Sequence, residues 1–210
     1  MILLISLSSN ALAYNVTNTD TKYYVPSENT VENQFTKAEI LTLEKYIYLN
    51  QEGLFELNKK QAKNDGIKDS LLNGQQEYFY HINSLIKNGE ITVGENLVIY
   101  NNSRKATATA SHWPSCGGGV TTNSEYHWWG YSRYTCDCLT QDISSDLNSV
   151  AGVVAGITLI AACFGPIPAL PPGLTSAYFW VLASRLDANN HGRGVYIEMT
   201  WALAFDITPQ

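Results

Sequence analysis

The sequence predicts an α+β protein, in which a helical N-terminal region is followed by a hydrophobic helical hairpin packed on a small antiparallel sheet. Three observations lead to this fold class. Helical periodicity dominates the chain before residue 90, a long apolar stretch occupies residues 147–184, and strict alternation of apolar residues marks residues 194–208. The 210 residues suffice for one ordinary domain or two small ones.

The apolar stretch from Leu147 to Ser184 contains no charged residue. Its first part, residues 147–164, places Gly152 and Gly156 four positions apart. On a helix this spacing gives a flat stripe that a second backbone can approach closely. The pair Gly165-Pro166 ends that helix, because proline lacks an amide hydrogen and clashes with the preceding turn.

A second apolar helix is expected at residues 174–186, with Trp180 on it. The first helix has about eighteen residues, which is the lower limit for spanning a bilayer, and the second is shorter. The hairpin therefore either enters a membrane or lies buried in a folded domain. The sequence leaves both alternatives open.

The last segment, residues 194–208, is predicted to be one long strand. Its apolar residues recur at every second position from Val195 to Ile207, so one face packs on a core. A strand of this length needs a partner, and residues 124–136 are the expected one. The helices of the hairpin would then pack on this sheet.

The N-terminal region is predicted to be mainly helical. Thr36 and Glu39 form a capping box that begins a helix, which Gly53 closes. A second helix runs from Ser70 to Lys87. Two short strands are expected between Ile91 and Tyr100.

A change in composition near residue 101 predicts a domain boundary. No lysine follows Lys105, and every cysteine and tryptophan lies after it. We therefore expect a helical domain with its linker at residues 14–105 and a second domain at residues 106–210. The adjacent Arg104 and Lys105 form a suitable cleavage site for a trypsin-like protease.

The first thirteen residues are interpreted as a signal peptide. A short apolar run is followed by Ala11-Leu12-Ala13, which fits the small-residue pattern of signal-peptidase sites. Cleavage is expected after Ala13, and the protein is expected to be secreted. The basic residues that open a signal peptide are missing, which we interpret as a truncated start.

The four cysteines agree with export, because disulfides form in oxidising compartments. Cys136 and Cys138 are too close in sequence to pair readily. Two patterns remain: Cys116–Cys136 with Cys138–Cys163, or Cys116–Cys138 with Cys136–Cys163. Either pattern ties the first hairpin helix to the segment at residues 136–138. A metal site of Cys136, Cys138 and His127 is the alternative.

Aromatic residues cluster in the turn-rich segment before the hairpin. They could form a belt at a membrane interface, a platform for stacking sugars, or part of the core. The residues concerned are Trp113, Trp128, Trp129 and Tyr131.

Few residues suggest catalysis. Glu125 with His127 is one conceivable acid–base pair of a hydrolase, but the chain lacks a nucleophile motif and zinc-binding spacing. We therefore predict that the protein is not an enzyme and needs no cofactor or metal. A net charge of −6 without a basic patch argues against nucleic acid as a partner.

The layout of the chain resembles that of secreted, propeptide-bearing bacteriocin-like proteins of Gram-positive bacteria. The features that carry the resemblance are Ala11-Leu12-Ala13, the lysine-free second half, the Gly-Val-Val-Ala-Gly run at residues 152–156, and the Gly-Arg-Gly-Val-Tyr run at residues 192–196. The chain departs from most such peptides in being acidic.

The resemblance implies an antibacterial precursor. A processing protease would remove the pro-domain, residues 14–105. The hairpin within the second domain, residues 106–210, would then act on the target-cell membrane, with Trp128, Trp129 and Trp180 at the interface. An immunity protein is the further partner that the resemblance implies. The competing interpretation is a secreted binding module, whose aromatic loop at residues 113–134 binds a cell-wall sugar or a protein while the hairpin stays buried.

Overall fold

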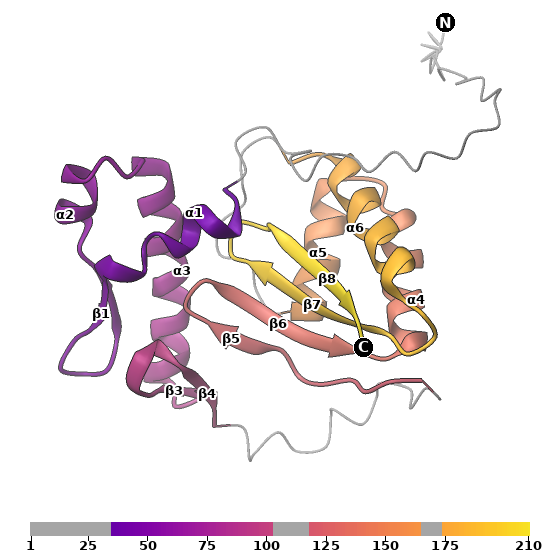
Figure 1. The fold of residues 1–210 in the computed structure, drawn as a ribbon, viewed down its shortest axis with the longest axis horizontal. Helices are drawn as coiled ribbons and strands as arrows, with labels where there is room; N and C mark the ends of the chain where they lie inside the picture. Colours follow the sequence, from indigo (N-terminus) through magenta and orange to yellow (C-terminus); the bar gives the residue numbers. More distant parts are fainter. Residues whose placement is uncertain (1–34, 103–117, 165–173) are drawn as a thin grey trace, which may run out of the picture.

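The computed structural model describes residues 35–102, 118–164 and 174–210 (Figure 1). These residues form an α+β architecture of helices and small antiparallel sheets, which confirms the α+β class of the prediction. The predicted signal peptide with Ala13, the processing pair Arg104 and Lys105, and the residues Trp113, Cys116, Gly165 and Pro166 all lie outside the described residues.

The N-terminal part consists of short elements arranged around one long helix. They are α1 (Lys37–Leu41), a 3-10 turn (Glu44–Tyr46), β1 (Ile47–Leu49), β2 (Phe55–Leu57), α2 (Lys59–Asn64), α3 (Asp69–Lys87), β3 (Ile91–Val93), a second 3-10 turn (Glu95–Leu97) and β4 (Ile99–Asn101). β1 pairs with β2 and β3 with β4, each pair antiparallel. The predicted helix at residues 70–87 and the two short strands after it are confirmed.

The predicted helix from Thr36 to Gly53 is wrong beyond its first turn. The capping box does form, since the Glu39 amide donates to the Thr36 hydroxyl at 3.2 Å. However, α1 ends at Leu41. The following Tyr46-Ile47-Tyr48 run favours a strand, because aromatic and β-branched side chains suit a pleated surface, and it pairs with β2.

The C-terminal part carries the larger sheet and three helices. Its elements are β5 (Glu125–His127), β6 (Gly130–Thr135), α4 (Asp137–Asn148), α5 (Val153–Phe164), α6 (Ser176–Asn189), β7 (Val195–Thr200) and β8 (Phe205–Pro209). The strands are antiparallel in the order β5-β6-β7-β8. The pairing of β6 with β7 confirms the partner predicted for the last strand.

The single long strand predicted at residues 194–208 is instead a hairpin of β7 and β8. Thr200 and Ala204 close its turn through a 2.7 Å backbone hydrogen bond, and Leu203 adopts a positive φ of 64°. The Tyr178 hydroxyl donates to the Leu203 carbonyl at 2.7 Å and so supports this unfavourable backbone conformation. The period of two continues across the turn because both strands bury the same sheet face.

The first hairpin helix predicted at residues 147–164 is also divided. α4 begins well before Leu147 and ends at Asn148, and α5 begins at Val153. Ser149 is the C-cap of α4, and its hydroxyl donates to the Asp146 carbonyl at 2.8 Å, so this terminal carbonyl has a partner. The second helix, predicted at residues 174–186, is confirmed as α6.

The helices α4, α5 and α6 cover one face of the four-stranded sheet, and α3 lies near the β5–β6 turn (Figure 1). Buried residues of both halves of the chain belong to one hydrophobic cluster. From α3, the Tyr78 hydroxyl bonds to the carbonyls of His127 and Gly130 at 2.7 and 2.8 Å. α3 therefore packs directly against the sheet.

Candidate functional site

The two glycines of the predicted hairpin stripe have different surroundings. A Cβ atom at Gly156 would lie 2.4 Å from the ring of Phe179, so α5 and α6 approach closely there. Gly152 precedes α5 and has nothing within 4 Å of such a Cβ. Of these two glycines, only Gly156 allows the close packing of α5 against α6. Trp180 of α6 lies on the surface with 53% of its area exposed.

The hairpin helices do not match the prediction of a membrane-spanning element. α5 has 12 residues, and no helix in the described ranges combines the length and hydropathy that a bilayer crossing requires. Ile160, Phe164 and Phe179 instead face the protein core. This corrects the predicted insertion of the hairpin across a membrane.

The predicted disulfide patterns are wrong, because both require a bond from Cys163 and Cys163 carries a free thiol. Its side chain is buried in the apolar layer between the helices and the sheet, near Leu147 and Ile197. This burial raises the pKa of Cys163 to about 11. The alternative metal site is not formed either, since no three potential ligands gather within the part of the chain described.

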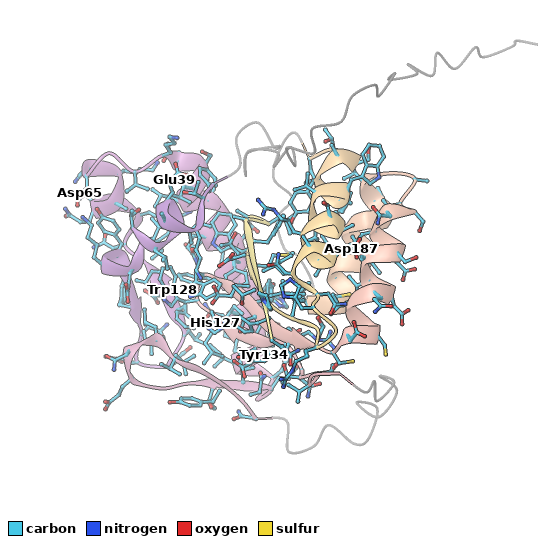
Figure 2. All side chains as sticks on the ribbon, turned by 45° about the vertical axis from the view of Figure 1, so that its right-hand side comes forward. Glu39, Asp65, His127, Trp128, Tyr134 and Asp187 are labelled. Atoms are coloured by element: carbon cyan, nitrogen blue, oxygen red, sulfur yellow. The ribbon has the colours of Figure 1, made fainter. Side chains whose placement is uncertain are left out.

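The aromatic residues of the β5–β6 hairpin belong mainly to the core. Trp128 is 7% exposed and Tyr131 is also buried, with its ring edge against Tyr78. Trp129 is partly buried and stacks on His127 with centroids 4.5 Å apart, while the Lys37 amine lies 4.3 Å from the Trp129 ring centre. Figure 2 shows His127 and Trp128 in this region. These rings therefore do not form an open platform.

The conceivable catalytic residue His127 has a structural partner. Its Nε2 atom lies 2.7 Å from the hydroxyl of Ser132, which is 1% exposed. Burial lowers the pKa of His127, although the nearby carboxylates of Glu125 and Glu198 oppose this shift. A substrate has no access to Ser132, so this pair does not supply an exposed nucleophile.

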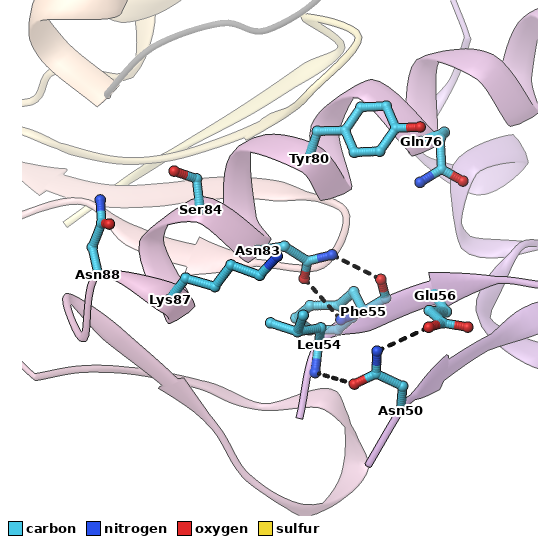
Figure 3. A pocket seen from close by; sticks show the side chains of 10 residues that line it. All are labelled: Asn50, Leu54, Phe55, Glu56, Gln76, Tyr80, Asn83, Ser84, Lys87 and Asn88. Atoms are coloured by element: carbon cyan, nitrogen blue, oxygen red, sulfur yellow. Dashed lines mark hydrogen bonds between the residues drawn. The ribbon is translucent and has the colours of Figure 1, made fainter. Parts of the chain in front are cut away.

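A groove that the sequence did not predict lies between α3 and the β1–β2 hairpin (Figure 3). Its volume is about 570 Å³. Most of the lining residues carry polar side chains, although polar and apolar atoms contribute about equally to the lining surface, and one aromatic ring is exposed. The lining consists of Asn50, Leu54, Phe55, Glu56, Gln76, Tyr80, Asn83, Ser84, Lys87 and Asn88.

The floor of the groove is fixed by Asn83. Its side-chain oxygen accepts from the Phe55 amide at 2.8 Å, and its side-chain nitrogen donates to the Phe55 carbonyl at 2.9 Å. The amide thus bonds the outer edge of β2 as a neighbouring strand would. This pair of bonds holds the hairpin against α3 and sets the width of the groove.

The carboxylate of Glu56 is held in place at one side of the groove. It accepts hydrogen bonds from the Tyr48 hydroxyl at 2.7 Å and from Asn50 at 2.9 Å. These bonds lower the pKa of Glu56, with Tyr48 the larger contributor. Glu56 is therefore ionised at neutral pH, and Tyr48, which is 47% exposed, lies beside it.

The opposite wall consists of side chains that are available to a ligand. Gln76, Tyr80, Ser84 and Lys87 follow the spacing of one helix face along α3. No hydrogen bond or ion pair engages these four side chains within residues 35–102, 118–164 and 174–210. Tyr80 is 61% exposed. The spacing of these residues was the only feature of the sequence that could have indicated this wall of the groove. Ordinary solvent-exposed helix faces show the same spacing, so it does not identify a binding site.

Comparisons with known proteins do not extend this description. No family model, curated protein or solved structure matches the chain.

Proposed function

We propose that this protein binds a saccharide in the groove between α3 and the β1–β2 hairpin. The observation that carries the proposal is the exposed ring of Tyr80 among unengaged polar side chains. A sugar ring has an apolar face of C–H groups and a rim of hydroxyls. An aromatic ring packs on the face, while amide and hydroxyl side chains donate to and accept from the rim.

The size and polarity of the groove support this class of ligand. About 570 Å³ lies within the usual range of small-molecule sites, roughly 300–1,000 Å³, and suits a mono- or disaccharide. The lining carries amides, a hydroxyl and two charges, which favours a polar ligand over an apolar one. The net charge of −6 disfavours the phosphate backbone of nucleic acids.

This proposal belongs to the same class as the second interpretation of the sequence, a binding module for a sugar or a protein. The site differs, because it lies on α3 and not on the aromatic loop. The antibacterial role implied by the resemblance stays a prediction, and it no longer includes a bilayer-spanning hairpin. The groove provides a way for such a protein to recognise a cell surface.

The test is a titration of the folded chain with a panel of soluble oligosaccharides, in which ¹H–¹⁵N NMR spectra are recorded at each step. We expect shifts confined to the groove and a loss of affinity of about tenfold for Tyr80→Ala, because the ring supplies the apolar contact. Tyr100→Ala is the matched control, since Tyr100 is 56% exposed and lies on β4 outside the groove lining. The absence of binding, or equal losses in both variants, would refute the proposal.

A further inference from the structure

We infer that the saccharide carries a carboxylate and that Lys87 binds this group. The inference rests on the proposed function and specifies the ligand further. Among the ten residues that line the groove, Lys87 is the one cation and Glu56 the one anion. Their placement determines which ionic group the groove accepts and in which orientation.

Lys87 reaches toward the floor of the groove. It lies in the last turn of α3, and its side chain extends toward Asn83 (Figure 3). Lysines in the last helical turn often only complement the helix dipole. The side chain of Lys87, however, runs back along the helix toward Asn83, whose hydrogen bonds to Phe55 form the floor of the groove. Among the described residues, no carboxylate pairs with Lys87. Its amine is therefore available for a charge-assisted hydrogen bond with a ligand carboxylate.

Glu56 fixes the orientation of an acidic ligand. It lies on a different side of the groove from Lys87 (Figure 3), and its bonds to Tyr48 and Asn50 keep it in place and ionised. A ligand carboxylate near Glu56 would be repelled, whereas hydroxyl groups can donate to it. The acidic group of the sugar is therefore directed to the Lys87 side.

The amide of Gln76 narrows the ligand class further. Its side chain lines the groove beside Tyr80 (Figure 3) and is not engaged by any described residue. A primary amide can donate to a carbonyl and accept from an N–H, so it matches an N-acetyl group in both directions. Together these features indicate an N-acetylated amino sugar that also carries a carboxylate.

A matched pair of disaccharides tests the inference. N-acetylglucosaminyl-N-acetylmuramic acid and diacetylchitobiose share the N-acetyl groups, but only the first bears a lactyl carboxylate. We expect the full chain to bind the acidic disaccharide more tightly, by about fivefold, as one exposed ionic contact provides. Lys87→Gln should remove this preference, Lys87→Arg should retain it, and Lys60→Gln on α2 should leave it unchanged. The preference should also diminish at high salt.

The outcomes separate the two proposals. A preference for the acidic disaccharide that depends on a cation at position 87 supports the inference. Equal binding of both sugars, sensitive to Tyr80→Ala but not to Lys87→Gln, overturns the inference and retains the saccharide site. Binding of neither sugar, and of no other saccharide in the panel, overturns both.

Discussion

The indole nitrogen of Trp201 donates a 2.8 Å hydrogen bond to the side-chain oxygen of Gln75, and both residues are buried. The same Gln75 donates through its side-chain nitrogen to the Trp128 carbonyl at 2.9 Å. One glutamine on α3 therefore satisfies two buried polar groups of the C-terminal part. The long helix and the sheet are joined by this bridge as well as by apolar packing.

Gln75→Leu should lower the free energy of unfolding by about 2 kcal/mol. The leucine retains apolar volume but leaves the Trp201 donor and the Trp128 carbonyl without a partner in a buried place. Urea denaturation of the purified chain measures the effect. Gln76→Leu is the control, because Gln76 is adjacent and its side chain is unengaged, and its change should stay within about 0.5 kcal/mol. Equal losses in the two variants would show that the bridge contributes nothing specific.

Gly156→Ala should destabilise the fold by about 1–3 kcal/mol, because the new methyl group overlaps the Phe179 ring and forces α5 and α6 apart. Gly152→Ala should be tolerated, since open space surrounds that position. Thermal melts of both variants distinguish them. If both substitutions were equally harmful, the two glycines would form a common contact face after all.

The protein should lose stability on mild acidification because of His81. Burial lowers the pKa of His81 below its ordinary value of 6.5, although Glu90 opposes the shift. The Nε2 atom of His81 is buried and has no hydrogen-bond partner among the residues that the structure describes. The unfolded chain then binds more protons than the folded chain at mildly acidic pH. The contribution to the free energy of unfolding is complete above about pH 6.5 and decreases as the pH falls below it.

Melting temperatures between pH 7.5 and 5 test this dependence. His81→Gln should flatten the curve relative to the unsubstituted chain, while His191→Gln, at an exposed position, should leave its shape unchanged. His127 also has a lowered pKa, so part of the slope should persist in His81→Gln. Parallel curves for all three proteins would contradict the assignment to His81.

The thiol of Cys163 should resist iodoacetamide in the folded chain at pH 8. With its pKa at about 11, roughly one thiol in a thousand is ionised at that pH, and the side chain is buried as well. In urea, without reductant, Cys163 should react readily, and peptide mass spectrometry would locate the label. Failure to react in urea until a reductant is added would show that Cys163 is in a disulfide.

Local patterns in the sequence were sufficient for some elements. α3 follows from its apolar periodicity, and β3 and β4 follow from short β-branched runs around Gly94. By contrast, the β7–β8 turn contains no glycine, asparagine or proline at residues 201–204, and it depends on the distant Tyr178 hydroxyl. The hydrogen bond from Tyr178 to Leu203 cannot be predicted from the residues around this turn.

The groove could not be predicted from the sequence because its two walls are far apart along the chain. Asn83 and Phe55 are separated by 28 positions, and their contact depends on how the β1–β2 hairpin packs on α3. The choice among the three alternatives for the aromatic cluster, which the structure decides for the core at Trp128 and Tyr131, depends on a similar long-range contact. Trp128 and Tyr131 look exposed in a turn-rich segment, but α3 covers them through Gln75 and Tyr78.

The double hydrogen bond between Asn83 and Phe55 has a consequence for self-association, which it should disfavour. The outer edge of a two-stranded hairpin normally presents free amide and carbonyl groups, which template the addition of a strand from another molecule. The Asn83 side chain occupies the amide and carbonyl groups of Phe55, the first residue of β2, and so blocks that end of the edge. The residue that fixes the floor of the groove therefore also covers part of an exposed strand edge, so a substitution of Asn83 should change the groove and the tendency to self-associate together.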